Sequence, residues 1–166
     1  MNRTKGVSLA KGPVGIIGAV LLAGGILGLL MGSTDFATSA PDGDVTGGTF
    51  LGIEGNGWTW LLFAGAGIVL LVGAPMHWGA KTTAMIVGVA LAAAAVIAVV
   101  DGSDVLGIFA ANWATELVWA AAAAALLIVS MMPRVGRRRE AEVEDRDRRF
   151  ERDGRVEEPA DTHRRA

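Results

Sequence analysis

The chain has 166 residues, of which 52% are hydrophobic, and it contains no cysteine, which excludes disulfides, thiolate metal sites and cysteine nucleophiles. Its formal net charge of -2 hides an asymmetry, because the charged residues gather at the two ends and in short connections between apolar runs. This pattern is typical of an integral membrane protein and excludes a soluble domain built from amphipathic helices.

Four apolar runs are about as long as the ~20 residues that span ~30 Å of hydrocarbon as a helix. A helix satisfies all its backbone hydrogen bonds within one segment, which hydrocarbon demands. The sequence therefore predicts an all-α membrane protein with a transmembrane domain over residues 13–132, preceded by a short N-terminus (1–12) and followed by a charged tail (133–166). The four predicted spans are residues 13–32, 58–74, 80–100 and 113–132.

The N-terminal residues 1–12 contain Arg3, Lys5 and Lys11 but no acid. Positive charge beside a span favours the cytoplasmic side, so we expect this end to stay in the cytoplasm. A cleaved signal peptide is the alternative, since small residues follow at 37–40. The length of the apolar run and Pro41 after the cleavage position argue against it.

Glycines recur every four residues in the first predicted helix, at Gly24, Gly28 and Gly32. Small residues at this spacing let a second helix approach closely, because helix association in lipid relies on van der Waals contact. We predict that this face packs against the other three helices, with a homo-oligomer contact as the alternative. Gly88 is the corresponding small residue of the third helix.

The longest connection, residues 33–56, carries acids but no Lys or Arg, so we expect it outside the cell. Asp42 and Asp44 lie in a predicted turn beginning at Pro41. They fall far short of a calcium loop, which needs more oxygen ligands at regular alternation.

A short segment occurs twice and organises the chain. Its copies are Leu51-Gly52-Ile53 followed by Asn56 and Thr59, and Leu106-Gly107-Ile108 followed by Asn112 and Thr115. Each asparagine is placed to cap the helix that follows it. Because each unit contains two spans, the second begins in the same orientation as the first. The segment thus predicts two helical hairpins that form parallel repeats in a four-helix bundle.

Tryptophans near the predicted helix starts favour headgroup depth, where amphipathic rings prefer to lie. We assign Trp58, Trp60 and Trp113 to the outer interface. Trp78 lies in the short connection that leads to Lys81, which we predict to be cytoplasmic. His77 in that connection has no Cys, His or acid at ligand spacing, so we interpret it as an ordinary loop histidine and predict no metal site.

The tail from Arg134 is rich in both charges, with acids four residues before arginines, as in Asp145 and Arg149. This order favours a solvated helix over residues 134–153. Eleven Arg against ten acids argue against nucleic-acid binding, and we expect Arg134 and the arginines at 137–139 to touch anionic lipid. All fifteen Lys and Arg fall on the predicted cytoplasmic side, which places both termini of a multi-pass plasma (inner) membrane protein in the cytoplasm.

The two Leu-Gly-Ile segments, each with its Asn and a Gly- or Ala-rich helix, resemble a family of small four-helix membrane proteins from high-GC Gram-positive (actinobacterial-type) bacteria, catalogued as a domain of unknown function. The resemblance covers residues 7–132. It implies polar groups, typically His or Asp, then Asn, then His, at three, four and seven residues after the asparagine. Here these positions hold Thr59, Trp60 and Phe63 in the first copy and Thr115, Glu116 and Trp119 in the second. Without the histidines, no metal, haem or proton role carries over, and we predict no cofactor.

Glu116 is the one acid within a predicted span, and such residues are candidates for function. It lies one turn after Asn112, near the positive end of its helix, so a helix-terminal role competes with binding of a proton, cation or polar partner. No acid-base or nucleophile pair predicts an enzyme. We expect a non-catalytic structural or accessory component whose partners are the lipid bilayer and a homo-oligomer or membrane protein. The alternative is a small oligomeric transporter or channel that uses Glu116.

Overall fold

A computed structural model describes residues 10–40, 43–76, 78–102 and 104–132, and residues 143, 145–146 and 148–150 of the tail. Leu9–Met132 form one compact unit, and the tail belongs to another. The described residues are mostly helical, and three helices are long and apolar enough to cross a membrane. These are α1 (Lys11–Met31), α3 (Gly79–Asp101) and α4 (Trp113–Met131). The prediction of a mostly helical membrane protein is confirmed at this level.

The remaining apolar helix is α2 (Gly57–Gly73), which has 17 residues. The bounds of all four helices fall within two residues of those predicted from hydropathy. The connections contain an element that the sequence patterns did not indicate. Two short antiparallel hairpins pair β1 (Gly48–Phe50) with β2 (Ile53–Gly55), and β3 (Asp104–Val105) with β4 (Phe109–Ala110).

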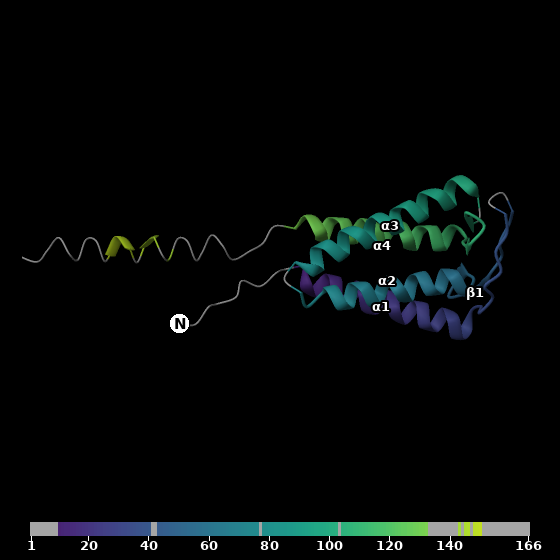
Figure 1. Cartoon of the computed structure of the whole chain (residues 1–166), viewed down its shortest axis with the longest axis horizontal. Coiled ribbons are helices and arrows are strands. Elements are labelled where there is room, and N and C mark those ends of the chain that lie inside the picture. The colour runs from purple at the N-terminus through teal and green to yellow at the C-terminus, as the bar shows by residue number, and fades with distance from the viewer. Residues whose placement is uncertain are drawn as a thin grey trace, which may run out of the picture. The chain divides into compact units, whose positions relative to one another are not determined.

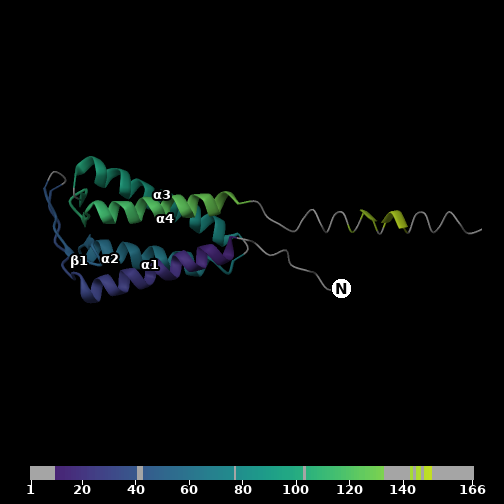
Figure 2. The ribbon, with the colours of Figure 1, turned by 180° about the vertical axis from the view of Figure 1, so that it is seen from behind.

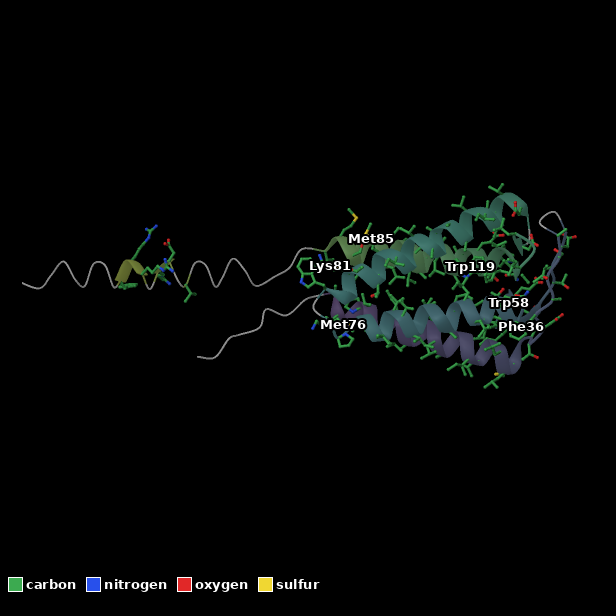
Figure 3. The ribbon with its side chains drawn as sticks, viewed as in Figure 1. Phe36, Trp58, Met76, Lys81, Met85 and Trp119 are labelled. Carbon is green, nitrogen blue, oxygen red and sulfur yellow. The ribbon has the colours of Figure 1, made fainter. Side chains whose placement is uncertain are left out.

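The helices pack as two pairs. α1 lies along α2 and α3 lies along α4, and contacts between α2 and α3 contribute to joining the pairs (Figures 1 and 2). All four strands lie where α1 and α3 end and α2 and α4 begin, which we call the hairpin end of the bundle. Lys81 and Met76 mark the opposite end (Figure 3).

The two pairs bury matching positions. Each buried position of α1 and of its cap Ala10 has a buried counterpart 70 residues later in α3, and each buried position of α4 has one 56 residues earlier in α2. The first set pairs Ala10 with Ala80, Val14 with Ala84, Gly18 with Gly88, Leu21 with Leu91, Gly25 with Ala95, and Gly28 with Ala98. The second set pairs Thr59 with Thr115, Phe63 with Trp119, Gly67 with Ala123, Leu70 with Leu126, and Gly73 with Val129.

Glycines of α1 let α2 approach closely. A Cβ added at Gly25 would lie 2.4 Å from the backbone N of Ala64, and one at Gly28 would lie 2.1 Å from the Trp60 ring. Gly32 also faces Trp60, at 3.1 Å. Gly24 differs from the prediction, because a Cβ there would meet nothing within 4 Å. The close face therefore follows the buried positions rather than the four-residue glycine spacing.

Gly88 supplies the matching contact in the second pair. A Cβ at Gly88 would lie 3.1 Å from Leu127 and 3.2 Å from Leu126, both on α4. At Gly88 the added Cβ meets side-chain atoms of α4, whereas at Gly25 the same construction reaches backbone atoms of α2. Alanines stand at two matched positions of α3, Ala95 opposite Gly25 and Ala98 opposite Gly28 in the alignment of the two helices.

The prediction that Trp60 lies at the outer interface is wrong. Its side chain is 1% exposed and packs inside the bundle against α1, so it is no interfacial ring. The small residues Gly28 and Gly32 create the space that the indole fills. Trp58, Trp78 and Trp113 are 38%, 71% and 75% exposed, so these three remain available to an interface.

At the opposite end of the bundle, each helical pair has a lysine that bonds to a carbonyl just beyond the end of its second helix. Lys11 Nζ, at the start of α1, donates to Pro75 O just beyond α2 at 2.9 Å, and Lys81 Nζ, near the start of α3, donates to Met132 O just beyond α4. The last carbonyls of a helix lack partners within the helix, and a cation there is favoured by the helix dipole.

The described tail residues 143, 145–146 and 148–150 are helical. Arg149 and Asp145 form an ion pair with an N–O distance of 3.4 Å, at the predicted four-residue spacing. Both side chains are well exposed, so the pair contributes little stability. Arg134, the arginines at 137–139, His77, Pro41 and Asp42 lie outside the described residues, and so do the predictions made for them.

Candidate functional site: the paired hairpin turns

The two turns at the hairpin end share an uncommon backbone conformation. Leu51 and Gly52 have φ angles of 51° and 84°, and Leu106 and Gly107 have 56° and 68°. Two successive positive φ angles are those of a type I′ turn, which matches the twist of the flanking strands. Asparagine and glycine are the usual residues there, so leucine at the first position strains each turn. Leu51 is also 84% exposed.

Asparagines then cap the helices that follow the turns. Asn56 Oδ1 accepts from Thr59 N, and Asn112 Oδ1 accepts from Thr115 N, both at 3.0 Å. At α4 the threonine reciprocates, with Asn112 N donating to Thr115 Oγ1 at 3.4 Å. The caps satisfy N–H groups that have no partner within the helix.

The same four side chains also connect the two helical pairs. Asn56 Nδ2 donates to Ile108 O at 2.7 Å, and Asn112 Nδ2 donates to Gly52 O at 3.0 Å. Each bond ends four residues before the other asparagine. Each cap thus holds the β-hairpin of the other pair.

The threonines also form hydrogen bonds between the two pairs, to carbonyls two residues further along the chain than those bound by the asparagines. Thr59 Oγ1 donates to Ala110 O at 2.8 Å, and Thr115 Oγ1 donates to Glu54 O at 2.6 Å. Ala110 N and Glu54 N approach the Oδ1 atoms of the opposite asparagines at 3.5 and 3.4 Å. We call the group Asn56, Thr59, Asn112 and Thr115 the reciprocal clasp.

Burial makes the clasp energetically important. Asn56 is 1% exposed, and Thr59 and Thr115 are fully buried. A buried polar group that loses its partner costs about 1–3 kcal/mol, whereas a satisfied one contributes roughly 1 kcal/mol. The sequence indicated the caps through their spacing, but it carried no signal for the bonds between the two pairs.

An aromatic column lies beneath the clasp and crosses between the pairs. Phe50 and Trp60 meet edge to face at 6.4 Å, Trp60 stacks on Phe63 at 6.0 Å, and Phe63 contacts Trp119 at 6.3 Å. The Nε1 groups of Trp60 and Trp119 are buried without a partner among the described residues. At these positions apolar packing, rather than polar chemistry, joins α2 to α4.

Glu116 lies outside the clasp. It is half-buried in the first turn of α4, and its own N–H donates to Asn112 O at 3.0 Å. At this position the helix dipole stabilises a carboxylate. The acid that the sequence analysis missed is Asp104, in strand β3, which is 5% exposed.

No group of three His, Cys, Asp or Glu side chains that could hold a metal ion occurs within the described ranges. Neither a protein-family model, nor a curated protein, nor a solved structure matches the chain.

Proposed function

We propose that the chain is a four-span plasma-membrane protein, built from two parallel hairpin repeats, that acts as a non-catalytic structural or accessory component. In this proposal the hairpin end faces outward and both termini are cytoplasmic. The matched burial, the matched lysine caps and the reciprocal clasp support a duplicated unit. The resemblance to the small four-helix membrane family belongs to the same proposal.

A membrane-spanning role for the shorter α2 is supported by its packing along α1. Contacts run from Gly28 on Trp60, through Gly25 on Ala64, to Gly15, whose Cβ would lie in ordinary van der Waals contact with Ala74 at 3.9 Å. α2 therefore lies along α1 over most of its length. A helix packed in this way along a membrane-spanning helix covers a similar depth of the bilayer. Its 17 residues cover ~25 Å at ~1.5 Å each.

The observation that carries the non-catalytic role is the use made of the clasp side chains. The amide groups of Asn56 and Asn112 and the hydroxyls of Thr59 and Thr115 all bond within the chain. These groups hold the two pairs together. Their hydrogen-bonding capacity is used within the protein, so they are not free to bind a substrate. In this proposal the protein acts by binding other membrane components through its surface.

Single-cysteine labelling tests the four-span topology cleanly, because the natural chain has no cysteine. We expect Thr46→Cys, at the hairpin end, to react with an impermeant maleimide in intact cells. Met76→Cys, between α2 and α3, should react only after permeabilisation. Labelling of both from the same side would show that α2 does not span, and would overturn this topology.

Native mass spectrometry of the protein extracted in nanodiscs from its own membrane tests the accessory role. We expect a complex with another membrane protein, retained in a Glu116→Gln variant. A homo-oligomer that supports an ion flux in vesicles, with the flux abolished by Glu116→Gln in a folded protein, would instead establish the transporter alternative.

A further inference from the structure

The connection between α1 and β1 is fastened directly over the second turn. Ser39 N donates to Gly107 O at 2.8 Å, and a Cβ at Gly107 would lie only 2.6 Å from Ala40 O. Val45, further along this connection, is 6% exposed. Residues 39–40 and 43–45 and the second turn therefore share a close interface at the hairpin end.

Asp104 lies within this interface. It is 5% exposed, and its Oδ2 atom is buried with no hydrogen-bond partner among the described residues. Backbone groups of Gly107 and Val45 interact with its carboxyl group. One carboxyl group thus touches both sides of the interface and keeps one oxygen unsatisfied, which is costly for a charged group.

The charged neighbours of Asp104 are acids. Asp101, at the end of α3, and Asp44, in the connection, both repel a negative charge on it. The sequence has no Lys or Arg between Lys11 and Lys81 or between Lys81 and Arg134, so no basic side chain of the transmembrane unit lies near the hairpin end. Burial first, then Asp101 and Asp44, raise the pKa of Asp104, and its contacts with Gly107 and Val45 oppose the rise.

We propose that Asp104 is a proton-binding site that fastens residues 39–40 and 43–45 of the connection to the second turn in acid and loosens them as the pH rises. Protonation removes the repulsion from Asp101 and Asp44 and gives the carboxyl group an O–H. Because the folded state binds the proton more tightly than the unfolded chain, stability is greatest below the ordinary pKa of 3.8 and falls as the pH rises through the raised value. This inference is independent of the proposed accessory role.

Amide hydrogen exchange of the full chain in nanodiscs tests it, after correction for the intrinsic pH dependence of exchange. We expect protection of residues 39–40, 43–45 and 104–110 to increase between about pH 8 and about pH 4, by about tenfold for each unit by which the pKa is raised. Asp104→Asn, a neutral analogue of the protonated acid, should stay protected throughout. Asp35→Asn, an exposed acid in the same connection, should behave like the natural protein.

A second variant keeps the test decisive if Asp104→Asn fails to fold. Asp101→Asn removes one repelling charge and should move the transition of the otherwise natural protein to lower pH. Protection that does not change with pH in the natural protein would overturn the proposal. So would a pH response that survives in folded Asp104→Asn, or a transition that Asp101→Asn leaves in place.

Discussion

Asn56 and Asn112 each donate through Nδ2 to a carbonyl in the β-hairpin that precedes the other, at Ile108 and Gly52 respectively. Each residue also caps its own helix through Oδ1. A single side chain thereby couples the start of one helix to the turn of the other pair. Formation of either cap is favoured once the opposite hairpin is in place, so the two pairs stabilise each other.

Removal of one asparagine should therefore cost more than a helix cap alone. We expect Asn56→Ala to lower the free energy of unfolding by about 2–4 kcal/mol, since a lost cap costs ~1 kcal/mol and unpaired buried groups cost ~1–3 kcal/mol. Asn112→Ala should cost less, because the Asn112–Gly52 bond is exposed. Unfolding by sodium dodecyl sulfate in mixed micelles measures both, and equal losses below about 0.5 kcal/mol would contradict the clasp.

The threonine hydroxyls offer a gentler probe of the same clasp. Thr59→Val keeps the shape of the side chain but removes the donor to Ala110 O, so we expect a loss of about 1–2 kcal/mol in the same unfolding assay. Thr82→Val is the matched control, because Thr82 Oγ1 donates to Trp78 O within its own helix turn on an exposed surface. An equal effect of the two changes would show that the bond between the pairs carries no special weight.

Hydropathy located the helices because a helix long enough to cross a bilayer appears in the sequence as a continuous apolar run. The paired segments likewise predicted Asn56 and Asn112 as caps, since capping depends on residues only three apart. Bonds such as that of Thr115 with Glu54, 61 positions away, depend on how the pairs dock, which no local pattern encodes.

The glycine face illustrates the same limit. Spacing alone selected Gly24 together with Gly28, but the buried stripe of α1 passes through Gly25 instead. In an amphipathic helix the polar face shows which side is buried, but α1 is apolar on all sides and gives no such indication. The face of α1 that meets α2 is therefore fixed by the shape of α2. Trp60, whose ring rests on Gly28, supplies that shape.

Two neighbouring glycines should accordingly respond differently to the same substitution. Gly28→Ala places a Cβ 2.1 Å from the Trp60 ring, and we expect a loss of about 1–3 kcal/mol from overpacking. Gly24→Ala meets nothing within 4 Å and should be neutral or slightly stabilising, because alanine favours a helix more than glycine does. Adding Trp60→Phe to Gly28→Ala should recover part of the loss. A destabilising Gly24→Ala that also breaks an oligomer would instead place a second copy on that face.

Leu51 holds a left-handed conformation at an exposed position, where its side chain gains little from burial. Asparagine tolerates this backbone better and is the favoured residue at the first central position of a type I′ turn. We therefore expect Leu51→Asn to raise the free energy of unfolding by about 0.5–1 kcal/mol. Thr49→Asn, an exposed strand substitution two residues earlier, should give no such gain.

The same Leu51→Asn variant shows whether the strained leucine contributes to binding a partner. If leucine is retained for a partner or for the lipid surface, the more stable variant should lose its co-purifying protein in native mass spectrometry while its topology by cysteine labelling stays unchanged. Retention of the partner together with higher stability would show that the exposed leucine side chain makes no contribution to binding. A lower stability of Leu51→Asn would contradict the assignment of strain to this turn.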